Sequence, residues 1–503
     1  MKKIILLTGA LALMVGSGCK KEYLDTASTE QVDIGTIFTT TEKANAALNG
    51  IYRYMFERTV ETTSNAQGKP GLTGILLGVD HMGEDLHQAS ATWFTSTGEG
   101  NYVGPRTDNH AVTRYYYRTL FRMVGNANII LDNIDNVIGT DSEKARIKAE
   151  ALTLRAYAYS YLVQFYGKRY DAAAKPNAQL AVPLPLKSTD VKMPRVSVEE
   201  VYASVIKDLE TAIDLYATAS TRANKSHANI WVAKGLRARV ALTMQDYPNA
   251  IKFAKEVVDG NQFPLMNETA YLSGFNDAPN LSEVMWASMP TLNQGDAFGS
   301  YFAQIAYNAN TTYQRGTPKR INSALYDLIS ATDVRKKMWE KAPTAANFPL
   351  PTTAFVRSPY MSRKFSVKDI AGPSLGDVSL LRSSEMYLIL AEAYAKAAQP
   401  ANAQNTLFVL TSKRDPNAVK STNLGDALVN EIMVNRRVEL WGEGFRYLDL
   451  KRLNQALDRA AVPNYASISV AEKMKIPAGD VQWEFFIPRS EMEANPNIGP
   501  QNP

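Results

Sequence analysis

The sequence predicts a mostly α-helical protein: a scaffold of paired helices, interrupted by two long irregular insertions. Apolar residues recur in steps of three and four over several long segments, which is the period of an amphipathic helix. Two other segments are rich in Gly, Thr, Ser and Asn and lose this period. The apolar fraction of 45% over 503 residues is sufficient for a large buried core.

The N-terminus has the pattern of an export signal. Lys2 and Lys3 precede an apolar run from Ile4 to Val15. About a dozen apolar residues are too few to span a bilayer as a helix, but they suit the core of a signal peptide. Residues 1–18 are therefore predicted to be a signal peptide that is removed from the mature protein.

Cys19 is the only cysteine of the chain, and it directly follows Gly16, Ser17 and Gly18. This arrangement is typical of a bacterial lipobox, in which the thiol is acylated and becomes the mature N-terminus, although such motifs usually carry Leu where this chain has Gly16. The alternative is an incidental cysteine beside an ordinary cleavage site. We predict lipidation of Cys19 and a single mature domain over residues 19–503, tethered to the membrane by its lipid alone.

The composition excludes several other classes of protein. The formal net charge is only +5, and no run of lysines or arginines marks a nucleic-acid-binding surface. No later segment reaches 18 consecutive apolar residues, so the sequence predicts no membrane-spanning helix. With Cys19 acylated, no thiol would remain for a disulfide, and burial of the core alone would have to stabilise the exported chain.

In chain order, the first helix is expected over residues 41–56, with Thr41 as its N-cap. Helices then dominate residues 115–260 and return over residues 380–457. The segments with the clearest helical pattern are Glu143–Tyr166, Val198–Tyr216, Ala228–Gln245, Tyr247–Asp259, Leu380–Ala398, Pro400–Lys413 and Leu424–Leu457.

Small residues recur where these helices would cross. They include Ala233, Ala238, Ala241, Ala250 and Ala254. Short paired helices with small residues at the crossing are typical of tetratricopeptide-type hairpins, although the spacing is too irregular to count repeats. A generic helical bundle is the alternative interpretation.

The two remaining segments, residues 57–114 and 262–378, are expected to be long irregular insertions in this scaffold. Stretches of this length without regular structure inside a helical chain are either functional or mobile.

Several motifs are similar to those of one family, the SusD/RagB surface nutrient-binding lipoproteins of Bacteroidetes. The family's signature resembles N-R-R-V-E-L-W-G-E-G-F-R-Y-L-D-L-K-R at 435–452, and its closing motif resembles F-I-P-R-S-E-M-E-A-N-P-N-I-G-P-Q-N-P at 486–503. Two helices of the family are similar to residues 154–167 and 381–394, and its N-terminal lead is similar to K-K-E-Y-L-D after Cys19. One departure is Asn435, where the family pattern usually has Glu.

The resemblance implies a SusD-like fold, in which four tetratricopeptide-like hairpins form an α–α superhelix with loops and small strands packed against it. It also implies a lipoprotein of the outer membrane, facing outside, that partners a SusC-type TonB-dependent channel. Such a protein would capture glycans, or in some members peptides or other oligomers, without catalysis and without a cofactor. A structural lid with little ligand affinity of its own is a further alternative.

No nucleophile elbow, glycine-rich phosphate loop or metalloprotease motif occurs in the chain. The chain has 50 acidic residues, so the sequence leaves open a pair of facing carboxylates as in glycosidases, but no motif indicates one. We therefore predict that the protein is not an enzyme.

A dense pattern of charges in the signature segment has two interpretations, an anion-binding or catalytic cluster and a set of structural ion pairs. The family resemblance favours ion pairs, with Glu443 to Arg446 and Asp449 to Arg452 at three-residue spacing. The residues of this pattern are Arg436, Arg437, Glu439, Glu443, Arg446, Asp449, Lys451 and Arg452.

The segment D-H-M-G-E-D-L-H at 80–87 combines two of the four histidines with three carboxylates. His81 and His87 are six residues apart, which is not the spacing of a helical zinc pair, and no cysteine ligand accompanies them. No metal site is predicted. A structural calcium held by loop carboxylates and carbonyls is conceivable.

The best candidates for ligand binding are aromatic residues in the two insertions, because sugar rings stack their C–H faces on aromatic planes while their hydroxyls need polar partners. Each aromatic could instead belong to the core, an alternative favoured for Trp286 by its apolar context V-M-W-A, and Trp231, Trp441 and Trp483 are expected to pack in the core. The first insertion offers Trp93 and Tyr102 with Asp80, Asn101 and Arg106. The second offers Trp286, Tyr301, Tyr307 and Tyr313 with Asn308 and Asn310.

Overall fold

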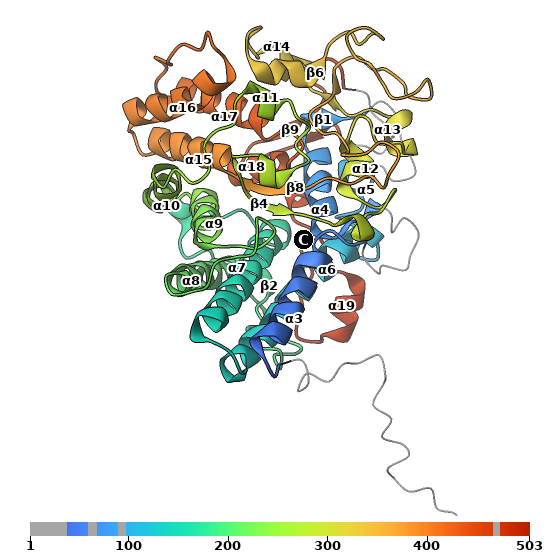
Figure 1. The fold of residues 1–503 in the computed structure, drawn as a ribbon. Coiled ribbons are helices and arrows are strands. Elements are labelled where there is room, and N and C mark those ends of the chain that lie inside the picture. Colours follow the sequence, from blue (N-terminus) through green and yellow to red (C-terminus); the bar gives the residue numbers. More distant parts are fainter. Residues whose placement is uncertain (1–37, 59–67, 89–96, 466–472) are drawn as a thin grey trace, which may run out of the picture.

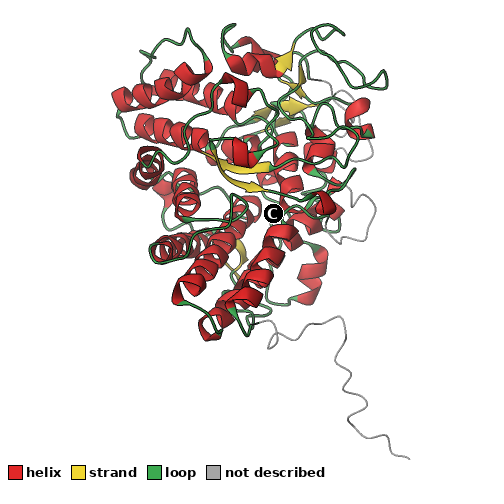
Figure 2. Cartoon of the chain, in the orientation of Figure 1, coloured by secondary structure: helices red, strands yellow, loops and turns green. Residues whose placement is uncertain are grey.

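The computed structural model describes residues 38–58, 68–88, 97–465 and 473–503. Long helices run along the left and lower parts of the molecule, and shorter elements joined by loops occupy the rest (Figures 1 and 2). The long helices are α3 (Thr41–Tyr54), α6 (Ala111–Asn133), α7 (Asp141–Tyr166), α8 (Val198–Tyr216), α9 (Ile230–Thr243), α10 (Tyr247–Asp259), α15 (Ser383–Lys396), α16 (Pro400–Arg414) and α17 (Gly425–Glu439). The shorter ones are α4 (Gly71–His81), α5 (Thr97–Gly100), α11 (Glu268–Tyr271), α12 (Tyr301–Ile305), α13 (Thr312–Arg315), α14 (Ser323–Asp327), α18 (Arg446–Arg452) and α19 (Arg489–Ala494).

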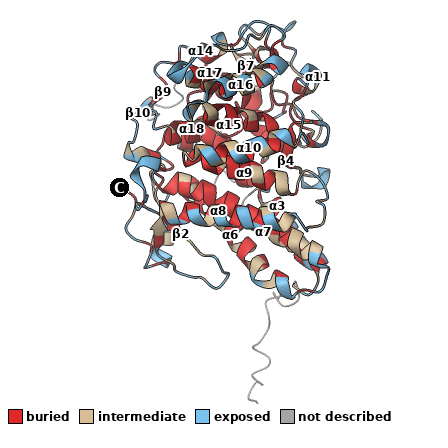
Figure 3. Ribbon diagram, turned by 90° about the vertical axis from the view of Figure 1, so that its left-hand side faces the viewer, coloured by how far each residue is buried: buried red, intermediate tan, exposed pale blue. Residues whose placement is uncertain are grey.

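The long helices pack in chain order, which confirms the predicted helical scaffold. Helix α7 contacts α6 and α8, and α9 contacts α8 and α10. Helix α10 then packs against α15, although the whole second insertion separates them in sequence, and α15 contacts α16 and α17. The alanines expected at the crossings of α9 and α10 are fully buried. Figure 3 shows buried and exposed residues alternating along α8 and α10, as amphipathic helices on one core require, whereas the residues of α9 between them are buried or half-buried.

Side-chain caps fix where these helices begin. At α7, the Thr140 hydroxyl accepts a hydrogen bond from the Glu143 amide, and the Glu143 carboxylate accepts one from the Thr140 amide. Ser197 and Glu200 repeat this capping box at α8. The first helix begins at Thr41 as predicted, but its N-cap lies one residue earlier, because the Thr40 and not the Thr41 hydroxyl accepts from the Lys43 amide.

The strands are short. They are β1 (Leu86–His87), β2 (Leu180–Pro183), β3 (Arg195–Ser197), β4 (Val284–Ser288), β5 (Arg320–Ile321), β6 (Trp339–Glu340), β7 (Met361–Ser362), β8 (Val378–Arg382), β9 (Leu457–Asp458) and β10 (Lys475–Ile476). The antiparallel pair β4–β8 joins the two ends of the second insertion, with Val284 opposite Arg382. A second sheet has the order β1-β5-β7-β6 and pairs Leu86 of the first insertion with Ile321 of the second. The two insertions therefore form one structural unit.

The first insertion is less irregular than predicted, because it contains the helix α4. All eleven residues of Gly71–His81 are buried. A helix that is buried on every side has no polar face and therefore no amphipathic period, so its pattern does not identify it. Gly74 and Gly78 allow its backbone to approach the hydroxyls of Tyr115 and Tyr116 on α6. The prediction that residues 57–114 are irregular was therefore wrong for this segment.

Two further boundaries differ from the sequence prediction. The segment Leu380–Ala398 begins as the end of strand β8, and helix α15 starts only at Ser383. The expected helix Leu424–Leu457 is divided into α17 and α18 by a turn in which Gly442 and Gly444 have φ angles of +80° and +87°. Such left-handed conformations suit glycine, which has no Cβ. Within the described ranges, no helix is long and apolar enough to cross a membrane.

Candidate functional site

A groove in the second insertion combines aromatic and polar side chains. Its volume is about 690 Å³, within the range of ligand-binding sites in proteins. It lies near α11, α14 and β6, at the top of the view in Figure 1. We call it the insertion groove; its lining includes Tyr307, Tyr326, Lys336, Trp339, Glu340, Asn347 and Arg363.

Tyr307 is the aromatic residue best placed to contact a ligand in this groove. Its ring is half-buried and meets the ring of Phe348 edge to face, with centroids 5.5 Å apart. The guanidinium of Arg363 covers the same Phe348 ring at 4.1 Å. Tyr307 and Arg363 therefore both pack against one buried phenyl ring, and this packing restricts their side chains at the groove.

A second aromatic edge is formed by Tyr326. Its ring packs against Tyr360 at 5.4 Å, and the ammonium of Lys336 lies 4.8 Å from its centroid. Lys336 also donates to the backbone oxygen of Ile329, which fixes the cation beside the ring. The groove thus has half-buried tyrosines on α14 and in the segment after α12, with a cation beside each.

Two buried donors of the groove have no acceptor among the described residues. They are the indole N–H of Trp339 and the Nε–H of Arg363. The guanidinium donates from Nη2 to the Asn347 backbone oxygen, and desolvation lowers the pKa of Arg363. Buried donors without partners are costly.

Four of the predicted ligand aromatics belong to the core instead. The side chains of Tyr102, Trp286, Tyr301 and Tyr313 are between 0% and 3% exposed. Tyr102 donates to the Met82 oxygen and Tyr301 to the Gly442 oxygen, so these hydroxyls brace turns. Rings buried in this way present no face on which a sugar could stack, which corrects their assignment. Trp441 and Trp483 are also buried, as expected.

The polar candidates of the first insertion likewise hold the fold together. Asp80 accepts the backbone N–H groups of Gly444, Phe445 and Arg446 at 2.9–3.3 Å, and so caps α18. Burial raises the pKa of Asp80 to about 7 against the opposing effect of these bonds. Asn101 accepts from the Val103 amide. These two residues do not line the insertion groove.

Arg106 fastens the C-terminal segment. Its guanidinium stacks on Phe486 at 4.0 Å and donates to the Glu484 oxygen at 2.6 Å. Trp93 lies outside the described residues, and its role stays a prediction. Among the predicted ligand-binding aromatics that lie within the described residues, only Tyr307 is half-buried and lines the insertion groove.

The sequence analysis missed Tyr326, Trp339 and Arg363. Their spacing in the chain carries no motif, because the groove is assembled from separate turns and short strands. A usable signal was the density of aromatic and basic residues over 326–363, where Tyr, Trp, Lys and Arg alternate with loop residues.

The charge pattern of the C-terminal signature forms a buried network of ion pairs. Glu439, fully buried, accepts from Arg382 at 3.1 Å and from Arg414 at 3.0 Å. The same two arginines bind Glu283 at 2.9 and 2.5 Å. Burial alone would raise the pKa of Glu439, but Arg414, Arg382 and Arg335 hold it well below its usual range. Glu283 directly precedes β4, and Arg382, Arg414 and Glu439 end β8, α16 and α17, so the network joins the insertion to the scaffold.

Of the two ion pairs predicted at three-residue spacing, the structure confirms one. Asp449 binds Arg452 at 2.7 Å as expected. Glu443 instead pairs with Lys364 at 2.7 Å, and Arg446 reaches back to Glu84. The predicted pair Glu443–Arg446 was therefore wrong, because tertiary partners displaced the local ones.

Arginine side chains also hold two of the three carboxylates at 80–87 that a structural calcium would need. Arg437 binds Asp85 at 2.5 Å, and Arg446 binds Glu84 through Nε at 2.9 Å. The departure from the family pattern at Asn435 is accommodated here too, because its side-chain oxygen accepts from Arg335. In the part of the chain that the structure describes, no group of three or more His, Cys, Asp or Glu residues could hold a metal ion.

Two family models match consecutive parts of the chain. One, described as starch-binding and associating with the outer membrane, matches residues 22–242. The other, the SusD family, matches residues 256–503. Together they span both insertions and the helical scaffold.

Individual relatives agree with these models. A SusD-like protein P2 of Formosa agariphila is 24% identical over 507 residues, which cover 93% of each chain. The crystal structure of a SusD-like carbohydrate-binding protein from Bacteroides vulgatus has a TM-score of 0.77 and 26% identity, covering 92% of this chain and 97% of that one. A SusD-superfamily structure from Bacteroides thetaiotaomicron, 23% identical, has a TM-score of 0.75 over 92% of this chain and all of that one.

Proposed function

Because the chain belongs to the SusD/RagB family, we propose that it captures glycans at the cell surface and delivers them to a SusC-type TonB-dependent channel. The family's members include proteins described as carbohydrate-binding, and one matching family model is described as associating with the outer membrane. Capture of peptides or other oligomers, and a lid with little affinity of its own, are the alternatives.

The observation that best supports glycan capture is the pairing of half-buried tyrosines with unpartnered donors in the insertion groove. Tyr307 supplies an aromatic plane for the C–H face of a sugar. The Trp339 indole N–H and the Arg363 Nε–H supply donors for its hydroxyls. A peptide would also need acceptors for its own N–H groups, and the groove's unpartnered groups are donors.

The proposed role is binding without catalysis. The acidic residues of the signature segment are occupied by arginines and a lysine inside the fold, so they are not available as a facing pair of acid and base. The carboxylate nearest the groove, Glu340, lies 3.8 Å from Arg363.

The class of ligand can be tested with the purified protein lacking residues 1–19. Calorimetric titration with panels of polysaccharides, oligosaccharides and peptides should give binding for a carbohydrate and none for peptides of similar length. Binding of a peptide in preference to every glycan would favour the alternative, and absence of binding to either panel would favour a structural lid.

We further propose that Cys19, which lies outside the described residues, carries the lipid anchor. Replacing Cys19 with Ser should release the protein from the membrane fraction while the thermal unfolding midpoint and the affinity for the glycan remain those of the wild type. Fractionation of cells that express each form measures this. Protease treatment of intact cells tests the outward orientation, because a chain that faces the periplasm would be protected. A Cys19→Ser protein that stays in the membrane would contradict the anchor.

A further inference from the structure

A small pocket lies at the boundary between the scaffold and the second insertion, where the last turns of α3 meet β4. Its volume is about 230 Å³, which is below the usual range for sites that hold a drug-sized ligand and suits a single ring. Figure 1 shows β4 and β8 directly above the upper end of α3. We call it the α3 pocket; its lining includes Tyr52, Phe56, His227, Trp286 and Met289.

The imidazole of His227 is held at the edge of this pocket by a buried carboxylate. Its Nδ1 lies 2.8 Å from Oε2 of Glu150, which is fully buried. A carboxylate only accepts hydrogen bonds, so the proton of the neutral imidazole is on Nδ1 and Nε2 keeps its lone pair. Tyr52 donates to the same oxygen at 2.5 Å, and its ring lies 4.6 Å from the imidazole. Arg146 donates to the other oxygen of Glu150 at 2.7 Å. These contacts fix the orientation of the imidazole.

The backbone that carries His227 is fixed against the insertion as well. Arg222 donates from Nη1 to the backbone oxygens of His227 and Met285, at 2.9 and 2.8 Å. The indole N–H of Trp286 donates to the Ser226 oxygen at 3.1 Å. These bonds join the segment before α9 to β4, so the wall of the pocket is preformed.

The opposite edge of the imidazole faces the pocket. The His227 side chain keeps 11% exposure although its Nδ1 faces a fully buried carboxylate, and Nε2 has no hydrogen-bond partner among the described residues. His87 differs, because its Nε2 is sealed inside the protein. An imidazole that served only to bond Glu150 would need no opening at Nε2. This nitrogen is therefore an acceptor placed for a donor from outside the chain.

The rest of the lining is apolar or uncharged, apart from one cation. Phe56 and Met289 are half-buried, so part of each side chain is open to the pocket. The cation among the described lining residues, Arg53, lies at the exposed rim and pairs with Glu57 at 2.9 Å. An aromatic face, a thioether and one nitrogen acceptor, without uncompensated charge, suit a neutral ring that has C–H faces and hydroxyl groups along its edge.

We propose that the α3 pocket binds a single neutral pyranose ring. A ring hydroxyl donates to Nε2 of His227, and a C–H face of the sugar packs on Phe56 and Met289. The pocket shares no lining residue with the insertion groove, so the inference does not depend on where the groove binds its glycan. It adds a site for one ring to a groove whose volume, about 690 against 230 Å³, has room for several.

NMR of the protein labelled with ¹³C at histidine Cε1 tests this contact directly, because the chain has only four histidines and Cε1 lies between the two ring nitrogens. The signal that is missing from His227→Gln assigns His227. The probes are the methyl pyranosides of glucose, galactose, mannose and xylose, each at up to about 100 mM, which saturates a site of millimolar affinity. At least one should shift the His227 signal along a saturable curve, and the signals of His81, His87 and His110 should stay in place.

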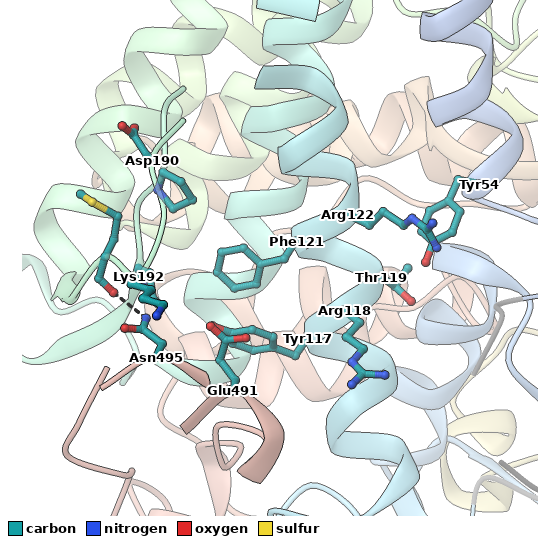
Figure 4. A pocket seen from close by; sticks show the side chains of 13 residues that line it. Tyr54, Tyr117, Arg118, Thr119, Phe121, Arg122, Asp190, Lys192, Glu491 and Asn495 are labelled. Carbon is teal, nitrogen blue, oxygen red and sulfur yellow. Dashed lines mark hydrogen bonds between the residues drawn. The ribbon is translucent and has the colours of Figure 1, made fainter. Parts of the chain in front are cut away.

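Phe56→Ala should weaken the affinity for that pyranoside roughly three- to tenfold, because it removes the aromatic packing surface. Phe121→Ala is the matched control. Phe121 is also half-buried, but it lies on α6, where it lines a separate cavity of about 470 Å³ on the side of the helix opposite Arg122 (Figure 4). This variant should bind the pyranoside as the wild type does, and unfolding midpoints check that both variants fold.

A His227 signal that none of the four pyranosides moves would overturn the proposal. Equal shifts of all four histidine signals, or an unchanged affinity in Phe56→Ala, would do the same. The wild-type titration decides the first two outcomes by itself, so a variant that fails to fold does not remove the test. Failure of the oligosaccharide panel in calorimetry concerns the insertion groove, and a His227 shift that persists in Tyr307→Ala leaves the α3 pocket standing in that case.

Discussion

Replacing Glu439 with Gln is expected to lower the free energy of unfolding by about 3–5 kcal/mol, the usual cost of breaking a buried ion pair. Glu439 is fully buried and binds both Arg382 and Arg414, which are themselves buried. The substitution removes the negative charge between them and leaves the arginines to share Glu283. Urea denaturation followed by tryptophan fluorescence measures the change.

The matched control is Lys337→Met, which breaks the ion pair between Lys337 and Glu268. Both partners are more than half exposed, and such surface pairs contribute at most about 1 kcal/mol. A loss below about 1 kcal/mol for Glu439→Gln would show that the network is not the structural link described above.

The same network predicts a dependence of stability on pH. The pKa values of Glu439, Glu443 and Asp449 are all lower in the folded protein than usual: burial opposes the shift, and neighbouring cations outweigh it. A carboxylate with a lowered pKa stabilises the fold above its unfolded value, about 4. That stabilisation is lost as the pH falls through the folded values. The unfolding midpoint should therefore decline below about pH 4, and less steeply in Glu439→Gln.

The double variant Tyr307→Ala/Arg363→Ala is expected to weaken binding of the glycan by about 2–4 kcal/mol, or roughly 30-fold or more. Tyr307 would lose the stacking surface, and Arg363 would lose a charged donor to sugar hydroxyls. Calorimetry with the tightest-binding glycan of the panel measures the effect. Because Arg363 also covers Phe348, the single variant Tyr307→Ala separates lost ligand contact from lost packing.

Tyr247→Ala is the control for this variant, since Tyr247 is a half-buried tyrosine at the start of α10, outside the groove. Its affinity for the glycan should equal that of the wild type. An unchanged affinity in the double variant would move the site elsewhere in the molecule.

The scaffold was predictable from sequence because helical periodicity is a local signal. Helices α8 and α10 have the bounds that their apolar spacing predicts. Helix α4 was not predictable, since burial on every side removes the period. The turn at Gly442–Gly444, which separates α17 from α18, was also not predicted, although the sequence shows both glycines.

The candidate site was predictable only as a region. Tyr102 stands in a polar context, yet its ring is buried against Tyr447 and Trp483, more than 300 residues later. Burial of that kind depends on tertiary contacts, which a local pattern does not contain. For the same reason, Glu443 pairs with Lys364 and Arg382 and not with the neighbouring Arg446.

The most direct test of glycan capture at the insertion groove is a crystal structure of the protein, without residues 1–19, in complex with the tightest-binding oligosaccharide. The expected result is a sugar ring stacked on Tyr307, with hydroxyls bonded to the Trp339 indole N–H and to Arg363. An oligosaccharide bound elsewhere, with the groove empty, would contradict this account.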